Sequence, residues 1–158
     1  SVFPDKLTAI AETRRVPRRD GHLVMSDVSV SGGLPPELDN LLGWVACASG
    51  ALPQDRWTGL LAEAGFDVTS SENRRTELTE LVAQARRRLA MLQGAVAAGI
   101  VPPGLELAPL PGSEAMLPDV EKMSIDDALA LGQDVLGKVA SAVESGDLGY
   151  VSIIASPA

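Results

Sequence analysis

The sequence of 158 residues predicts a single α/β fold. Segments in which apolar residues recur every three or four positions alternate with short apolar segments, and turn residues separate them. The first pattern predicts helices and the second predicts strands. Apolar residues make up 46% of the chain and aromatic residues only 3%, so aliphatic side chains must fill the core. Strands that alternate with helices indicate a sheet layered by helices.

The charge and the cysteine content exclude several classes of protein. A net charge of −8 argues against nucleic-acid binding, which needs a basic surface. Cys47 is the only cysteine, so no internal disulfide can form, and we expect a cytoplasmic protein in a reducing environment. The sequence contains no run of 18 apolar residues, so we expect no membrane span.

The first helix and the first strand are delimited by proline and glycine. Pro4 and Asp5 can open a helix, and Pro17 disfavours the helical conformation in the residue before it, so the helix should end near Val16. The segment 22–30 is apolar at first and alternates later. This pattern predicts a strand that is buried at its beginning and polar at its end.

Two helices and a second strand are predicted in the next part of the chain. A loop rich in Gly and Pro precedes a predicted helix over 37–48. Another helix should begin at Pro53 or Gln54, and Gly65 is its predicted left-handed end, where a positive φ costs little. The segment 66–69 then predicts a strand.

A long amphipathic helix follows this strand. Thr76 is its predicted N-cap, and apolar residues recur from Leu78 to Val96 at spacings of three and four. The segment 99–118 is rich in Pro and Gly, which indicates an extended connector.

The last helix and the last strand complete the predicted order. Ser124 with Asp127 three residues later resembles a capping box, and Gly146 should end the helix that they begin. The segment 149–155 predicts the third strand. Three strands are few for an independent sheet, so we expect further strands upstream of Ser1.

Several segments, in order and at matching spacing, resemble the arsenite methyltransferases, which are class I enzymes dependent on S-adenosylmethionine. The segments are Val2-Phe3-Pro4-Asp5-Lys6, Glu12-Thr13-Arg14-Arg15-Val16, Gly21-His22-Leu23-Val24-Met25-Ser26-Asp27-Val28, Leu34-Pro35-Pro36-Glu37-Leu38, Trp44-Val45-Ala46-Cys47-Ala48-Ser49-Gly50-Ala51-Leu52 and Leu60-Leu61-Ala62-Glu63-Ala64-Gly65-Phe66. The turn Pro17-Arg18-Arg19-Asp20-Gly21 departs from the family's pattern.

The resemblance implies a fold and a division of the chain. The expected fold is the C-terminal part of a Rossmann-like methyltransferase sheet, with helices on its faces and an inserted helical pair before the last strand. Residues 1–74 would form the C-terminal half of the core, 75–146 the helical insertion, and 147–158 the final core strand.

The same resemblance implies that the cofactor is held elsewhere. In this family the glycine-rich loop and the acidic residue that hold S-adenosylmethionine lie in the N-terminal half, and no segment of this chain resembles them. We therefore expect that the chain alone binds no cofactor. Its expected partners are a missing N-terminal half or a second chain.

Four residues are candidates for substrate binding. Cys47 matches a family cysteine that binds trivalent arsenic, a soft centre that selects thiolate ligands, although a lone cysteine is also a common buried apolar residue. Trp44 lies one helical turn away and would wall the same pocket, or simply pack. Ser26 and Asp27 are predicted to end a strand, and ligands of open α/β sheets bind outside the carboxyl ends of strands; alternatively they cap a turn. We expect no catalytic residue from this chain.

Two functions follow as hypotheses. The first is the substrate-side half of a methyltransferase that transfers a methyl group to a small acceptor, trivalent arsenic being one candidate, with catalysis mostly by positioning. The alternative is a non-catalytic, truncated methyltransferase-like module that pairs through an exposed sheet edge, as a homodimer for example.

Overall fold

The computed structural model describes residues 3–15, 21–32, 50–100 and 123–158. Their elements are, in chain order, α1 (Lys6–Arg15), β1 (Leu23–Val30), α3 (Gln54–Glu63), β2 (Phe66–Asn73), α4 (Arg75–Ala97), α5 (Ile125–Ser145) and β3 (Leu148–Pro157). This order confirms the predicted α/β class. The helix predicted over 37–48 lies outside the described residues, as does nearly all of the predicted connector.

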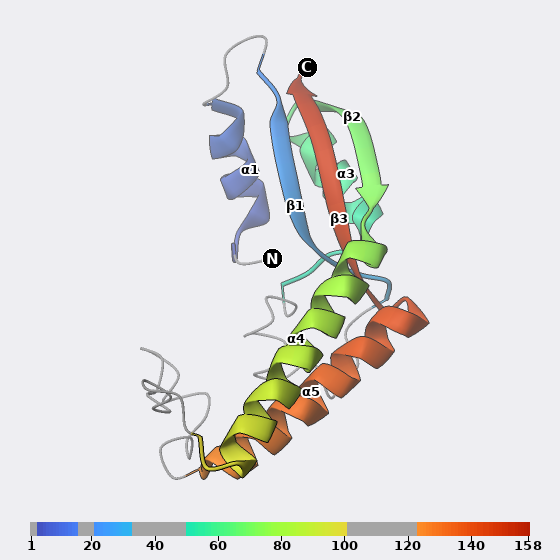
Figure 1. Cartoon of the computed structure of the whole chain (residues 1–158). Coiled ribbons are helices and arrows are strands. Elements are labelled where there is room, and N and C mark those ends of the chain that lie inside the picture. The colour runs from blue at the N-terminus through green and yellow to red at the C-terminus, as the bar shows by residue number, and fades with distance from the viewer. Residues whose placement is uncertain (1–2, 16–20, 33–49, 101–122) are drawn as a thin grey trace.

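The three strands form one sheet in the order β1-β3-β2, with β3 antiparallel to both of its neighbours (Figure 1). Leu23 pairs with Ala155 at one end of β1, and Val30 pairs with Leu148 at the other. Because both outer strands run against β3, they run parallel to each other. Their carboxyl ends therefore lie at the same edge of the sheet.

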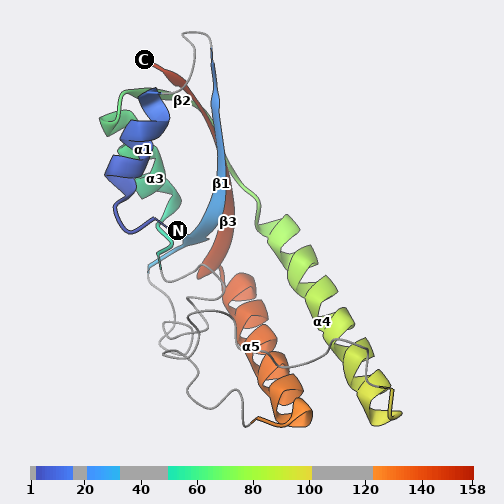
Figure 2. The same cartoon turned by 90° about the vertical axis from the view of Figure 1, so that its left-hand side faces the viewer.

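One face of the sheet is covered by α1 and α3, as the side view shows (Figure 2). Trp57, Leu60 and Leu61 of α3 are buried there, which agrees with the predicted apolar spacing of this helix. They pack in one cluster with alternate residues of β3, of which Val151 and Ile153 have no exposed surface. Alternation along β3 thus places its core side chains under the two helices.

The helices α4 and α5 pack side by side and meet the sheet only at one end (Figures 1 and 2). The contact with the sheet is a second apolar cluster, in which Ala142 and Val143 of α5 pack against Val30 and Leu148. Of the 23 residues of α4, only Val82 is buried. Most of the apolar stripe predicted for this helix therefore lies on a hairpin that projects away from the sheet.

The predicted helix ends are confirmed at three places. The Ser124 hydroxyl accepts a hydrogen bond from the backbone N–H of Asp127 at 3.1 Å, which is the expected N-cap bond, and it donates one to the Asp127 carboxylate at 2.6 Å. Gly65 and Gly146 follow the ends of α3 and α5 with φ of 82° and 88°, the left-handed region that favours glycine.

The N-cap predicted for the long helix is wrong. The helix α4 begins at Arg75, so Thr76 lies within its first turn. The backbone N–H of Arg75 donates instead to Oδ1 of Asn73 at 2.9 Å. This bond is available because β2 continues to Asn73, four residues beyond the strand predicted over 66–69.

The burial predicted for the first strand is also reversed. In β1 the first residues are partly or largely exposed, with Val24 at 65%, whereas Ser29 and Val30 are at 8% and 6%. Val30 is buried because α5 and Leu148 pack against it, and Val24, on the same face at the start of the strand, has no such cover among the described residues.

No helix in the described parts of the chain has the length and apolar character that a membrane crossing requires.

Trp57 allows a test of the core. Its side chain is 5% exposed, and its indole N–H has no hydrogen-bond partner among the described residues. Trp57→Ala should therefore cost about 3–5 kcal/mol of unfolding free energy. Trp57→Phe should cost less than about 1.5 kcal/mol, since it also removes an unsatisfied donor. Denaturant unfolding measures both, and equal losses would contradict this account.

Candidate functional site

A pocket of about 710 Å³ opens at the carboxyl ends of β1 and β2, beside the first turn of α3. Among the described residues its lining is mostly hydroxyl and amide side chains, with a single carboxylate. These polar residues are Ser29, Ser31, Gln54, Asp55, Thr58, Ser71 and Asn73. Ligands of open α/β sheets bind outside the carboxyl ends of the parallel strands, and this pocket has that position.

Glycine at position 149 leaves room between the polar residues of the outer strands. Gly149 of β3 pairs with Ser29 of β1. A β-carbon added at Gly149 would lie 2.9 Å from the Ser29 hydroxyl and 4.0 Å from the side-chain nitrogen of Asn73. Any other residue would therefore press against Ser29, which is itself buried. The missing side chain is what lets Ser29 and Asn73 approach each other across β3.

A β-bulge decides which polar residues of β2 enter the pocket. Val68 pairs with Ala155 and Ser70 with Ile154, so Thr69 is an extra residue in β2. Side chains alternate along a strand, and the extra residue reverses which positions face α3. Ser71 and Asn73 consequently line the pocket, whereas Ser70 lies on the opposite face.

The start of α3 is bonded to this strand. The side-chain amide of Gln54 donates to the hydroxyl of Ser71 at 2.8 Å and to its carbonyl at 3.3 Å. Asp55 lies in the first helical turn, where its carboxylate accepts from the backbone N–H of Arg56 at 2.9 Å. The free N–H groups at the start of a helix favour negative charge, so α3 stabilises the carboxylate of Asp55 in the wall of the pocket. Thr58, one turn later, completes this wall.

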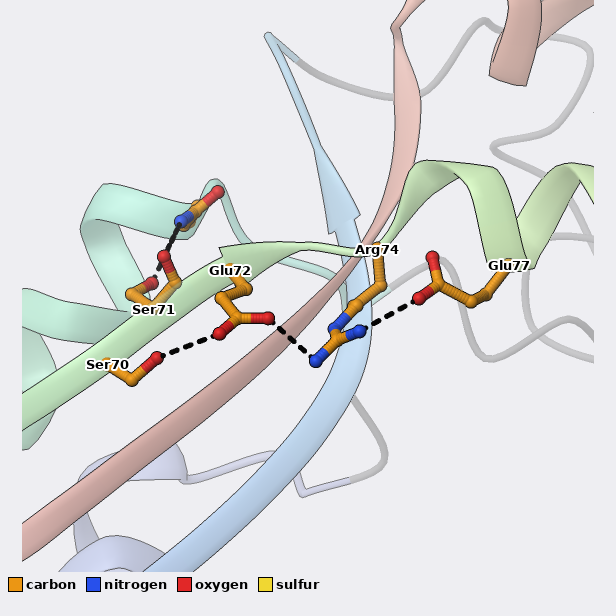
Figure 3. Close-up of polar contacts among 6 residues, drawn as sticks. Ser70, Ser71, Glu72, Arg74 and Glu77 are labelled. Carbon is orange, nitrogen blue, oxygen red and sulfur yellow. Dashed lines mark hydrogen bonds and ion pairs between the residues drawn. The ribbon is translucent and has the colours of Figure 1, made fainter.

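An ion-pair chain holds the junction between β2 and α4 on the other side of the strand (Figure 3). The guanidinium of Arg74 lies 2.6 Å from Glu72 and 3.0 Å from Glu77, and the hydroxyl of Ser70 donates to Glu72 at 3.3 Å. The hydrogen bond to Glu77, with the nearby charge of Glu72, raises the pKa of Arg74 above its usual range. Its own backbone N–H and then Arg74 lower the pKa of Glu77.

The structure describes two of the four residues predicted for the site, Ser26 and Asp27. Because β1 continues to Val30, Ser26 and Asp27 lie within the strand and not at its carboxyl end. Asp27 shares a strand face with Ser29, while Ser26 pairs with Ser152 on the opposite face. Their predicted contact with substrate stays a prediction. Trp44 and Cys47 lie outside the described residues.

The polar residues of the pocket were not identified from the sequence. Ser29 has a signal, because it lies on the same face as Asp27 two residues earlier in an alternating strand. No sequence pattern identifies Ser71 and Asn73. Serine, glutamate and asparagine rarely extend a strand, and the bulge reverses the strand face on which Ser71 and Asn73 lie. The described residues contain no group of three His, Cys, Asp or Glu side chains that could hold a metal ion.

Solved structures with similar folds include two methyltransferases and a cyclopropane synthase. A sarcosine dimethylglycine methyltransferase from Galdieria sulphuraria matches 98% of this chain with a TM-score of 0.63 and 16% identity. Phosphoethanolamine N-methyltransferase 2 from Haemonchus contortus, bound to phosphomonomethylethanolamine and S-adenosylhomocysteine, matches 97% with a TM-score of 0.65 and 13% identity. The cyclopropane synthase of Mycobacterium tuberculosis matches 95% with a TM-score of 0.59 and 14% identity. The chain has a methyltransferase-like fold.

This methyltransferase-like fold spans only part of each similar structure. The match covers 48% of the Galdieria enzyme, 30% of the Haemonchus enzyme and 49% of the cyclopropane synthase. No protein-family model and no curated protein sequence matches the chain. The likeness is therefore one of fold, at sequence identities too low to carry over a substrate.

Gly149 provides a test of the pocket's geometry. Gly149→Ala should lower the unfolding free energy by about 1–3 kcal/mol, because its β-carbon would press on the Ser29 hydroxyl. Adding Ser29→Ala removes that hydroxyl and should restore most of the loss. Denaturant unfolding of the two single variants and the double variant measures the coupling.

Gly137 in α5 is the matched control, since a β-carbon there meets no atom within 4 Å. Gly137→Ala should be neutral or stabilise the protein, as alanine favours helices. Strictly additive effects of Gly149→Ala and Ser29→Ala would contradict the proposed close approach.

The junction at Arg74 should make stability depend on pH. The folded-state pKa of Glu77 is lowered, so its contribution is present above the ordinary glutamate pKa of about 4.3 and is lost as pH falls through the folded value. The difference in melting temperature between the wild type and Glu77→Gln should therefore shrink below about pH 4. High salt should also reduce it, because both side chains are about half exposed.

Glu80 is the control for this measurement, because it lies on the same helix and has no ion pair among the described residues. Glu80→Gln should show a smaller difference at neutral pH. If Glu77→Gln and Glu80→Gln had the same pH profile, the ion-pair chain would not stabilise the junction.

Proposed function

We propose that this chain is the substrate-side part of an S-adenosylmethionine-dependent methyltransferase. The observation that carries the proposal is the order β1-β3-β2, in which an antiparallel final strand separates two parallel strands, together with the similarity to methyltransferase structures. In this proposal residues 1–74 and 147–158 belong to the core, 75–146 are a helical insertion, and the protein is cytoplasmic.

The cofactor would be held by residues outside this chain. The described residues around the pocket contain no glycine-rich turn between a strand and a helix, which is what a bound S-adenosylmethionine would need. When bound, the cofactor supplies an electrophilic methyl group. The outer edge of β1 is the proposed boundary with the cofactor-binding part, because among the described residues β1 pairs only with β3 and, through Ser29, with Leu52.

The pocket at the carboxyl ends of β1 and β2 would hold the methyl acceptor. Its hydroxyl and amide groups suit a small polar molecule, and the carboxylate of Asp55 favours one that carries an amine. The names of the Galdieria and Haemonchus enzymes point to amine acceptors as well. The chain's own contribution would be to bind and orient this acceptor, since positioning can account for much of a methyl transfer.

A narrower proposal concerns trivalent arsenic. It rests on the sequence resemblance around Cys47 and Trp44, because a thiolate is the ligand that arsenic requires and the pocket's own donors are oxygen and nitrogen. The alternative of a non-catalytic binding or dimerisation module rests on the edge of β1, where Ser29 alone pairs with another described residue, Leu52. One set of experiments distinguishes these possibilities.

The protein as its gene encodes it should bind S-adenosylhomocysteine in calorimetry and methylate small amines. Asp55→Asn should lower kcat/KM for an amine about tenfold, because it removes the only carboxylate among the described residues of the pocket, and should leave cofactor affinity unchanged. Glu63→Gln, at the far end of the same helix, is the matched control and should have no effect.

Other outcomes decide between the alternatives. Activity toward arsenite that is abolished by Cys47→Ser, with amines unreactive, would select the arsenic acceptor. A gene product that binds neither S-adenosylmethionine nor S-adenosylhomocysteine would contradict the methyltransferase proposal and favour the binding module.

A further inference from the structure

Ser29 lies near the carboxyl end of β1, in the wall of the pocket, and only 8% of its surface is exposed. Among the described residues it is the only polar one that is buried. Its hydroxyl forms no hydrogen bond to any of them. Buried hydroxyl groups nearly always have a partner, because an unpaired one has lost its bonds to water and gained nothing in return. We therefore expect the partner of Ser29 to enter through the pocket.

The other hydroxyl groups beside α3 are already bonded. The Ser71 hydroxyl accepts from Gln54 at 2.8 Å, and the Thr58 hydroxyl donates to a backbone carbonyl in the first turn of α3 at 2.9 Å. Trp57 carries a buried N–H without a partner, but this residue does not line the pocket. Within the described part of the pocket, Ser29 alone is both buried and unpaired.

Asn73 supplies a second donor beside the Ser29 hydroxyl. The side-chain oxygen of Asn73 accepts from the backbone N–H of Arg75 at 2.9 Å, which orients the amide, and its nitrogen forms no hydrogen bond among the described residues. A β-carbon at Gly149 would lie 2.9 Å from the Ser29 hydroxyl and 4.0 Å from this nitrogen. Because glycine leaves that space empty, one ligand atom over Gly149 can approach both groups.

The charges of the pocket favour an uncharged ligand atom at this position. Asp55 is the only charged residue among the described residues of the lining, which include no lysine, arginine or histidine. A carboxylate bound there would lose its hydration without gaining a cation, which costs free energy. The oxygen of a hydroxyl or an amide can instead accept hydrogen bonds from Ser29 and Asn73 without that cost.

We propose that the methyl acceptor carries an uncharged oxygen, in a hydroxyl or an amide group, and that Ser29 and Asn73 bind this oxygen over Gly149. The inference rests on the proposed function, in which Asp55 holds the amine of the same molecule. One contact from a strand end and one from the start of α3 fix the orientation of a small molecule. An acceptor without the oxygen leaves the Ser29 hydroxyl unpaired, so it binds less tightly.

Four series of amines test the proposal. Each carries a terminal hydroxyl, primary amide, carboxylate or methyl group on a short carbon chain of varied length. Their dissociation constants are measured by ligand-observed NMR with the protein as its gene encodes it, saturated with S-adenosylhomocysteine. At the best chain length, the hydroxyl or the amide compound should bind at least about tenfold tighter than the carboxylate and the methyl compounds.

Ser29→Ala should reduce the preference over the methyl compound to within about twofold. It should not lower the melting temperature, since it removes an unpaired hydroxyl. Ser152→Ala is the matched control, because it makes the same chemical change on β3, at a position that pairs with Ser26 on the opposite face of the sheet. This control should leave the preference unchanged.

Asn73→Asp distinguishes the two kinds of oxygen. It keeps the oxygen that accepts from Arg75 and removes the amide donor. A preference for the amide series should then disappear, whereas a preference for the hydroxyl series should persist, because a hydroxyl can donate to the new carboxylate.

Several results would overturn the inference. They are equal binding of the methyl series, tightest binding of the carboxylate series, a preference that Ser29→Ala leaves intact, and an amide preference that survives Asn73→Asp. Binding of S-adenosylhomocysteine without binding of any amine series would also overturn it, while the proposed methyltransferase function would keep its cofactor evidence. A protein that binds neither would overturn both.

Discussion

The structure depends on the insertion of β3 between β1 and β2. Both outer strands hydrogen-bond only to this last strand within the described sheet, so the sheet exists only when the end of the chain has returned. Val151, Ile153 and Ala155 of β3 have no exposed surface, which makes this strand the centre of the main core as well. The fold therefore rests on non-local pairing, which is costly in loop entropy and slow to form.

The return of the chain explains why the hairpin exists where it does. A strand antiparallel to β2 could follow it through a short turn, but here α4 and α5 intervene and meet the sheet at one end. That end is also where the pocket opens, because Asn73 ends β2 and Arg75 begins α4. The Arg74 junction thus joins the site to the hairpin, and its ion pairs orient one relative to the other.

Local features of the fold could be predicted from the sequence, and those that depend on pairing could not. Trp57, Leu60 and Leu61 indicated the buried face of α3 because helical spacing is a local property. Ser124 and the glycines after α3 and α5 indicated helix ends, because capping is also a local property. The length of β2 was underestimated because Ser71 and its neighbours have low strand propensity, and pairing with β3 overrides that propensity.

The candidate site illustrates the same limit. Its residues come from two outer strands and a helix start, and they converge only once the order β1-β3-β2 is known. Ser26 and Asp27 were chosen because they follow the apolar start of a strand, yet pairing with Val151 and Ser152 places them in its middle. Conversely, Gly149 carries no sequence signal, and its role is visible only from its closeness to Ser29 and Asn73.

Because of the bulge at Thr69, the side chains that line the pocket depend on the register of β2 as well as on its residue types. Upstream of it even-numbered residues face the helices, and downstream odd-numbered ones do. If β2 were regular, so that Thr69 paired with Ile154, Glu72 would face the pocket and Ser71 would turn outward. Loss of the bulge alone would thus change an uncharged wall of β2 into an acidic one without altering any residue.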